Sequence, residues 1–429
     1  MTVLDQGEPA GARGFFHPLT VVDFRRLWVA DGLWWLAMWM EMVILGWVAL
    51  SLTNSAWWVA LLGFFRSAPL AVTGLFGAAV TERFRRRHLI LFLQLVSLGS
   101  MAALALLFGA GVLAYWHLAV AAFVNGTAWS LDWPTRRALI PDLVGRDRIV
   151  DAMLLENLLQ GSARILGPLL AGSAMEWLGT LGSLMLLCLM GALAALFLAR
   201  MQTDSRSPDP ARSVGQSLAR VRTGLSHMVA NPRLLGVVLI TVTMNVWAFP
   251  FQALLPVFAR DVLGQGPVGL GLLASSHGVG VLLGLGGVYA VRGIWSNEWV
   301  FGAGSVLSCV GLMAFAGSSS FSLSLLVLVL AGAGQACFST MQSSITLVEA
   351  SEGMRARAMG TVVLAIGVGP LGRLQCGAMA AAWGAPVAVG AMALWAALST
   401  AGVMALVRGF LPSRQRTSSS SAADPPGPS

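Results

Sequence analysis

Long apolar runs recur along the whole chain and constrain its fold more than any other feature. Each run has about 20 residues, which is enough for a helix to cross ~30 Å of hydrocarbon. We place them near 25–51, 56–80, 88–110, 114–135, 152–176, 180–200, 234–258, 268–291, 298–317, 321–347, 358–382 and 386–408. The sequence therefore predicts an all-α integral membrane protein with 12 transmembrane helices.

The composition agrees with this prediction. Apolar residues make up 56% of the 429 positions and charged residues only 11%. A soluble domain carries about 25% charged residues, so this chain lacks the polar surface that water requires. We expect lipid to be its main solvent.

The runs fall into two sets of six. The predicted segments are a cytoplasmic N-terminal segment (1–24), an N-terminal half (25–200), a cytoplasmic linker (201–233), a C-terminal half (234–408) and a disordered cytoplasmic tail (409–429). Ser, Pro and Arg in the linker indicate an exposed connection. Its second part, 214–229, has the apolar spacing of a surface helix. A Gly-Pro-Leu sequence occurs in the fifth run, at Gly167, and again in the eleventh, at Gly369.

Arginine sets the predicted orientation. The chain has no lysine, and its 27 basic residues lie mostly in every second connection between runs. Arg260 is the exception on the other side. By the positive-inside rule, both termini are cytoplasmic in a multi-pass protein of the cell (inner) membrane. The same rule accounts for the net charge of +8, so no nucleic-acid partner is expected.

Enzyme chemistry is not indicated. The five histidines are widely scattered, and we find no nucleophile–base pair, metal-ligand spacing or phosphate-binding loop. The four cysteines each lie in a different apolar run, as small core residues do. We expect no catalytic residue, metal or cofactor.

The second connection carries a recognisable motif. It reads Gly-Ala-Ala-Val-Thr-Glu-Arg-Phe-Arg-Arg-Arg over residues 77–87. This resembles the signature loop of the major facilitator superfamily, Gly-x-x-x-Asp-Arg-x-Gly-Arg-Arg, with Glu82 in the acidic place and Ala78 and Arg85 as departures. The resemblance implies two six-helix halves around a central cavity, a monomer, and transport by alternating access.

Other segments are similar to the branch that contains the enterobactin (siderophore) exporter and macrolide efflux pumps. They include Phe24 to Trp28, Trp133 to Pro141 and the Arg355-Ala356-Arg357 sequence. This resemblance implies export of a small organic molecule, siderophore-like or drug-like, by an antiporter.

Ionisable residues inside the runs are candidates for substrate or proton translocation, because charge in hydrocarbon is costly. They are Asp31, Glu41, Arg66, Arg164, His277 and Arg373. In the resembled fold, the spans that hold them line or flank the cavity. The three cations on later spans, Arg164, His277 and Arg373, would suit an anionic or acidic-phenolic substrate. Neutral histidine packing and helix bracing by the arginines stay open as alternatives.

Glu41 and Arg66 lie at the same depth on adjacent antiparallel runs, each roughly 24 Å from its cytoplasmic end. Neither charge is tolerable alone, so we expect an ion pair. It is either a working pair that substrate or a proton breaks, or a permanent structural clamp. Asp31 and Glu156 lie nearer the cytoplasmic face, where gate contacts are expected.

Coupling to protons is expected through Glu41 or Asp31. The antiporter motif of the resembled family has an arginine in span 4, and this chain has Asn125 and Gly126 in that region. Three tryptophans of the first run, Trp34, Trp35 and Trp39, either form a stacking wall for the substrate or pack against lipid and helices.

A second set of charges lies in the cytoplasmic connections. We expect these residues to form interhelical salt bridges that act as a cytoplasmic gate, or only to set topology. The set is Glu82, Arg83, Arg86, Arg87, Asp132 and Arg136.

The sequence thus predicts a secondary-active exporter of a small organic molecule, whose partners are that substrate, protons and membrane lipids. A nutrient importer of the same fold and a transport-dead membrane sensor or scaffold are the alternatives.

Overall fold

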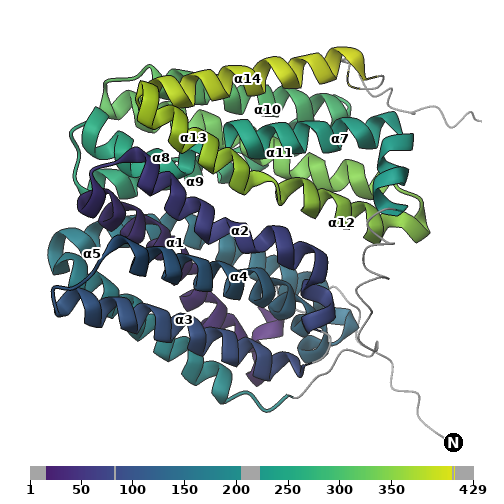
Figure 1. The fold of residues 1–429 in the computed structure, drawn as a ribbon. Helices are drawn as coiled ribbons and strands as arrows, with labels where there is room; N and C mark the ends of the chain where they lie inside the picture. Colours follow the sequence, from purple (N-terminus) through teal and green to yellow (C-terminus); the bar gives the residue numbers. More distant parts are fainter. Residues whose placement is uncertain (1–15, 82–83, 204–222, 408–409, 411–429) are drawn as a thin grey trace, which may run out of the picture.

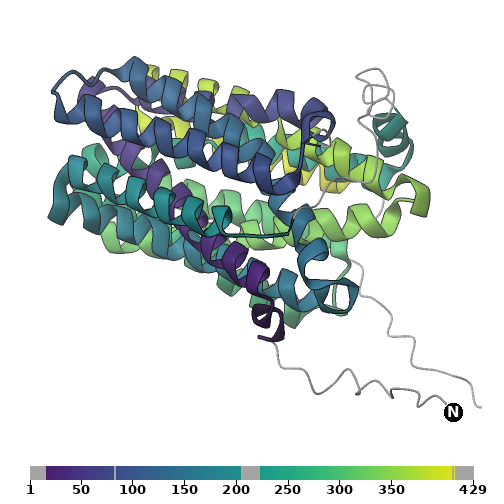
Figure 2. The same cartoon turned by 90° about the horizontal axis from the view of Figure 1, so that it is seen from below.

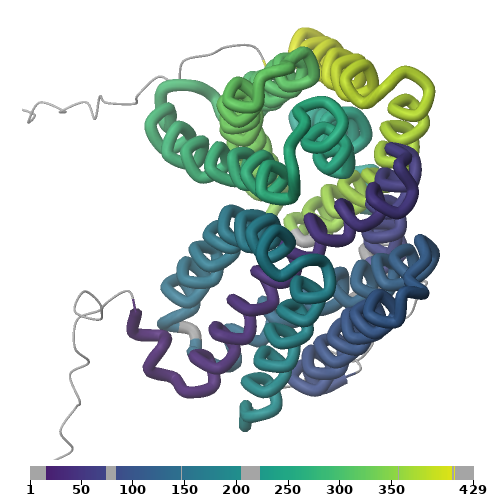
Figure 3. Tube along the Cα trace, turned by 90° about the vertical axis from the view of Figure 1, so that its left-hand side faces the viewer, coloured from purple at the N-terminus to yellow at the C-terminus, as the bar shows by residue number. Residues whose placement is uncertain are grey.

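The computed structural model describes residues 16–81, 84–203, 223–407 and 410. Its helices form two bundles that lie side by side (Figure 1), and the view along the helices shows the same division (Figure 3). Parts of three predicted segments lie outside the described residues: residues 1–15 of the N-terminal segment, most of the linker helix, and the tail after residue 410. Residues 223–230, at the end of that linker helix, are helical.

The described part of the N-terminal bundle holds five α-helices. They are α1 (Val22–Thr53), α2 (Ala56–Thr81), α3 (Arg86–Gly109), α4 (Tyr115–Val144) and α5 (Ile149–Ala199), with short 3-10 turns at η1 (His17–Thr20) and η2 (Arg146–Arg148). With 51 residues, α5 is long enough for two spans, and its backbone bends at Gly179, where φ is 66°. Glycine adopts a positive φ without steric strain because it has no Cβ. The two predicted runs 152–176 and 180–200 are therefore the two arms of α5.

The C-terminal bundle follows residue 231 in the described chain. Its helices are α7 (Pro232–Thr243), η3 (Met244–Ala248), α8 (Phe251–Val257), η4 (Phe258–Val262), α9 (Pro267–Val291), α10 (Asn297–Ala316), α11 (Phe321–Glu349), η5 (Glu352–Met354), α12 (Arg355–Ile366), α13 (Gly369–Trp383) and α14 (Ala385–Leu406). The segments α7, η3, α8 and η4 make one span, in which η3 and η4 are π-helical turns. Such turns are frequent at functional sites.

Ten helical stretches of the described chain are long and apolar enough to cross a membrane. The bend in α5 divides one of them into two, and α4, which is more polar, packs among them against α2 and α3. The predicted all-α membrane fold is confirmed.

Local sequence explains the boundaries of several helices. The first helix ends at Asn54, which adopts the left-handed conformation with φ of 48°. The Asn231 side chain caps α7 by accepting hydrogen bonds from the backbone N–H groups of Arg233 and Leu234. Pro267 opens α9, where its missing N–H needs no partner.

The helices run up and down between two ends of the molecule. We call the end where α1 begins, and where Arg86 and Arg136 lie, the arginine-rich end, and the other the opposite end. The N-terminal part of α1 extends along the N-terminal bundle at this end (Figure 2).

The two bundles touch mainly through α5 with α9 and α2 with α13. The Ser275 hydroxyl of α9 donates to the Ile165 carbonyl of α5 at 2.6 Å. Nearer the opposite end, the Arg260 guanidinium donates to the Leu50 carbonyl at 3.3 Å and to Asn54 Oδ1 at 2.9 Å. Such contacts hold the halves together on that side of the molecule.

Candidate functional site

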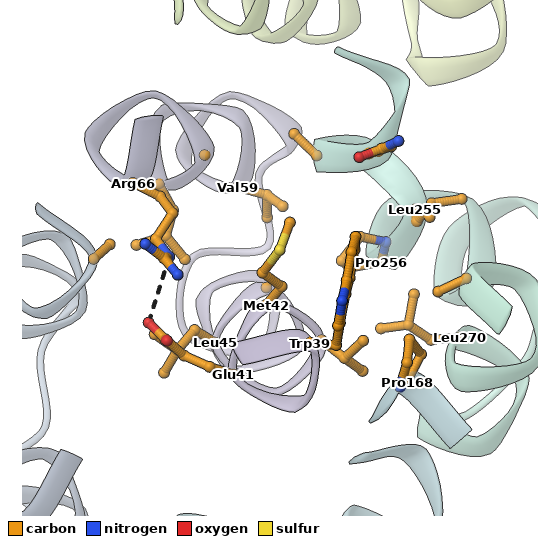
Figure 4. Close-up of a pocket in the computed structure, with 18 of the residues that line it drawn as sticks. Trp39, Glu41, Met42, Leu45, Val59, Arg66, Pro168, Leu255, Pro256 and Leu270 are labelled. Carbon is orange, nitrogen blue, oxygen red and sulfur yellow. Dashed lines mark ion pairs between the residues drawn. The ribbon is translucent and has the colours of Figure 1, made fainter. Parts of the chain in front are cut away.

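A cavity lies between the two bundles at the middle of the helices. Its empty volume is about 1030 Å³, part of which is open to solvent. Residues of α1, α2, α4, α5, α8, α9 and α13 line it, and Figure 4 shows part of this lining. Five of the six predicted translocation residues are among them: Glu41, Arg66, Arg164, His277 and Arg373.

The predicted contact between Glu41 and Arg66 is present. Arg66 Nε lies 3.7 Å from Glu41 Oε1 (Figure 4), and the two side chains are 15% and 10% exposed. Asn125 Nδ2 of α4 donates to the same Glu41 oxygen at 3.0 Å. Asn125, from the region where the resembled family has its antiporter arginine, therefore holds this carboxylate.

Gly126 explains how α4 comes close enough to do this. A Cβ at this position would overlap the Arg66 carbonyl oxygen of α2. Small residues let membrane helices approach backbone to backbone. The neighbouring Asn125 is thereby carried to the ion pair.

Arg164 and His277 lie together on the other side of the cavity. Arg164 Nη2 donates to Gln335 Oε1 at 3.0 Å and lies 3.5 Å from His277 Nδ1. The guanidinium also sits over the Trp39 ring, 5.3 Å from its centroid. A nitrogen that faces a guanidinium donor is the unprotonated one, so the imidazole is neutral in this arrangement.

Arg373 of α13 crosses to the N-terminal half. Its Nη1 donates to the Ser67 hydroxyl of α2 at 3.0 Å. With Arg66 and Arg164 it makes three guanidinium groups on the cavity wall, against the single carboxylate of Glu41. The described lining therefore carries an excess of positive charge.

Asp31 does not line this cavity, although the sequence groups it with the translocation residues. It is buried inside the N-terminal bundle and pairs there with Arg136. Arg136 Nε also lies 3.0 Å from Asp132 Oδ1, and Arg136 Nη2 donates to Gln94 Oε1 at 3.2 Å. Ten residues of helix separate Asp31 from Glu41, which turns their side chains about 80° apart.

The other predicted gate residues lie near the same end. Arg86 pairs with Asp142, and Arg87 Nη2 donates to the Ala199 carbonyl at 2.7 Å. Glu82 and Arg83 lie outside the described residues. These bonds, like those of Arg136, join helices within the N-terminal bundle, so they brace that half and do not bridge to the other.

Sequence reasoning missed Gln94 and Ser67. Both are uncharged polar residues within apolar runs, and each binds an arginine of a membrane helix. An arginine in a membrane helix needs acceptors, so a search for polar residues at matching depth is the signal that would have found them.

The family described as "transmembrane secretion effector" matches residues 13–428. None of the curated proteins compared with the chain matches it.

Several solved structures share the fold. A POT family transporter in complex with 5-aminolevulinic acid is 13% identical with a TM-score of 0.73, covering 93% of this chain and 98% of its own. An inward-facing, unoccupied bacterial homologue of the human lysosomal transporter Spinster is 14% identical with a TM-score of 0.71, covering 91% and 98%. A nucleoside transporter is 14% identical with a TM-score of 0.66, covering 89% and 99%.

Sequence identities of 13–14% with the solved structures show a shared fold. The family match extends over nearly the whole chain. The chain belongs to the transmembrane secretion effector family of the major facilitator superfamily, and it is a multi-pass membrane transporter.

Proposed function

We propose that the protein exports a small organic anion across the cell (inner) membrane by alternating access, with both termini in the cytoplasm. The observation that carries the proposal is the charge of the central cavity, where three guanidinium groups face one carboxylate. The description of the family as a secretion effector favours export.

The cavity charge favours an anion on physical grounds. Charged groups held in a membrane helix are stabilised by partners of opposite sign. Within the described residues, Arg164 has the neutral partners Gln335 and His277, and Arg373 has the neutral partner Ser67. A carboxylate or phenolate bound between them would supply the missing negative charge.

The rest of the lining supports a molecule with an aromatic or apolar body. Trp39, Met42, Leu45 and Leu270 offer large apolar surface beside the charged groups (Figure 4). Binding sites for small molecules commonly combine such a wall with a few polar anchors. Siderophores with acidic phenols and anionic drugs both have this character.

Two dyes with the same ring system test the charge preference. Fluorescein is an acidic phenol with a carboxylate, whereas rhodamine 6G is a cation of similar size. Everted membrane vesicles that contain the protein should accumulate fluorescein, quantified after filtration and extraction, more than vesicles without it. An imposed gradient, acidic inside, should raise that accumulation if export is coupled to protons.

Rhodamine 6G serves as the control for hydrophobic partition. Preferential accumulation of rhodamine 6G, or fluorescein levels equal to those of vesicles without the protein, would contradict the proposal. Uptake of fluorescein by intact cells in place of everted vesicles would favour the importer of the same fold.

A further inference from the structure

A second, smaller chamber lies within the N-terminal bundle. Its empty volume is about 480 Å³, and its walls come from α1, α2, α3, α4 and the second arm of α5. Glu41 and Arg66 line both this chamber and the central cavity, and no other described residue is shared by the two linings. The ion pair therefore stands between the two spaces.

Buried polar atoms in the chamber wall have no partner in the described part of the chain. The Asn125 side chain is 3% exposed, and its Oδ1 accepts no hydrogen bond, while the Trp129 indole Nε1 donates none. Both residues line the chamber. Leaving such groups unpaired is costly, so a polar space of this size is expected to hold water.

The chamber leads to a buried cluster of charges. Gln94 and Trp34 line it, and both contact Arg136: Gln94 through Oε1 at 3.2 Å, and Trp34 through its ring, 4.8 Å from the guanidinium carbon. Arg136 in turn pairs with Asp31 and Asp132. The chamber thus has the ion pair in one part of its wall and contacts of this cluster in another.

The cluster holds more acid than base. Asp31 of α1, Asp132 of α4 and Glu156 of α5 are at most 5% exposed, and Arg136 is the guanidinium buried with them. Arg137, on the partly exposed side of α4, adds a weaker attraction to Glu156. Three ionised carboxylates beside one buried guanidinium would leave an uncompensated charge, which the interior disfavours.

A single proton removes the excess. Arg136 pairs with Asp31 and Asp132, whereas Glu156 Oε1 accepts a hydrogen bond from the neutral Trp35 indole at 2.9 Å. Asp31 and Glu156 lie close enough to interact electrostatically, and two neighbouring carboxyl groups are most stable when one of them carries a proton. The pair is therefore suited to bind and release a single proton.

Glu41 is the wrong place for the proton of an anion antiporter. Protonation of Glu41 would free Arg66 to bind an anionic substrate, so proton and substrate would bind together. Antiport requires the opposite: the proton and the substrate must bind to different states of the transporter, so that binding of one disfavours binding of the other. A proton site outside the substrate cavity, on helices that move with the bundle, meets this requirement.

We propose that the chamber is a hydrated passage and that the Asp31–Glu156 pair binds the coupling proton, apart from the substrate. This inference rests on the proposed function. A proton from chamber water adds to the carboxylate pair in one conformation. It leaves from the same carboxyl group to water at the arginine-rich end in the other.

Purified protein in proteoliposomes separates coupling from transport. Two rates are measured: fluorescein uptake driven by a pH gradient of one unit, and fluorescein exchange with equal pH on both sides. The ratio of uptake to exchange reports coupling, because a loss of folded protein lowers both rates. One-for-one coupling to a gradient of this size supports up to about tenfold accumulation. In Asp31→Asn and Glu156→Gln the ratio should fall to less than about a fifth of its wild-type value. Unchanged ratios would overturn the inference.

A chamber-filling variant tests the passage itself. Ser97→Leu places a larger side chain in the chamber, whereas Ser100→Leu changes the same helix at a residue that does not line it. The uptake-to-exchange ratio should fall in Ser97→Leu and stay within about twofold in Ser100→Leu. Equal ratios in the two variants would refute the passage.

Hydroxyl-radical labelling gives a readout that needs no transport. Met101 lines the chamber and is 6% exposed, while Met392 is 1% exposed in the core of the other half. Water in the chamber should make Met101 oxidise at least about fivefold faster than Met392, and equal rates would show a dry chamber. If wild-type protein neither takes up nor exchanges fluorescein, the proposed function fails, and labelling still tests the passage.

Discussion

Removing the Glu41–Arg66 contact by stages tests whether the pair is a working part or a clamp. At the observed 3.7 Å, two unit charges attract with about 4.5 kcal/mol at an effective dielectric constant of ~20. Loss of one partner of a buried pair costs about 3–5 kcal/mol, since it leaves the other charge uncompensated. Both routes give a similar magnitude.

We therefore expect Glu41→Gln and Arg66→Met each to lower the free energy of unfolding in detergent by about 3 kcal/mol. The double variant should lose no more than either single one, which gives a coupling free energy of about 3 kcal/mol. Tryptophan fluorescence during denaturant unfolding provides the measurement. Losses that add to within about 0.5 kcal/mol would refute an energetically coupled pair.

Fluorescein transport by the same variants decides the role. A clamp predicts that the double variant, which is no less stable than either single variant, regains the transport that the single variants lose. A working pair predicts that transport stays lost in the double variant as well, because Arg66 is then no longer available to the substrate.

Three further outcomes follow from the structure. Gly126→Ala should lower stability by roughly 1–3 kcal/mol, since the new methyl group overpacks the contact between α4 and α2. Gly99→Ala, where a Cβ meets no atom within 4 Å, should stabilise by up to about 1 kcal/mol, and thermal unfolding compares the two. Arg164→Gln and Arg373→Gln should each raise the KM for fluorescein about tenfold or more, because each removes a charged anchor worth roughly 1.5–3 kcal/mol. Arg86→Gln should change stability by less than about 1 kcal/mol, because its carboxylate partner is 34% exposed; a loss above 2 kcal/mol in denaturant unfolding would contradict this.

Much of the fold could be predicted from the sequence because the bilayer allows few solutions. Apolar runs of spanning length must be helices in lipid, since their backbone groups have no other partners. Counting residues from the cytoplasmic end of each helix puts Glu41 and Arg66 at the same depth. Such a count is sufficient for neighbouring antiparallel helices, because both rise by the same distance per residue.

The rest depends on helix rotation, which the sequence does not reveal here. The first helix carries apolar residues on every side, so no amphipathic stripe shows which face meets the cavity. The sequence therefore groups Asp31 with Glu41, although the Asp31 side chain pairs with Arg136 within the bundle. The role of Gln94 cannot be predicted for a related reason. Uncharged polar residues occur throughout these runs, so nothing in the sequence marks this one as a partner of Arg136.

A reversible cross-link between the bundles tests alternating access most directly. A Cβ at Gly63 of α2 would lie 3.2 Å from Ala253 Cβ of α8, close to the separation of about 3.5–4.5 Å in disulfides. The two positions are changed to cysteine in a variant whose four native cysteines are replaced. Ala316 and Gly390, whose Cβ separation would be 3.5 Å, join two helices of the same bundle and provide the matched control.

Fluorescein flux through proteoliposomes is then measured before oxidation, after it and after reduction. The two halves must part at the Gly63–Ala253 contact for the cavity to open toward the opposite end. We predict that oxidation of this pair abolishes flux, that reduction restores it, and that the Ala316–Gly390 link has no effect. Undiminished flux with the Gly63–Ala253 link fully formed would contradict transport through the central cavity.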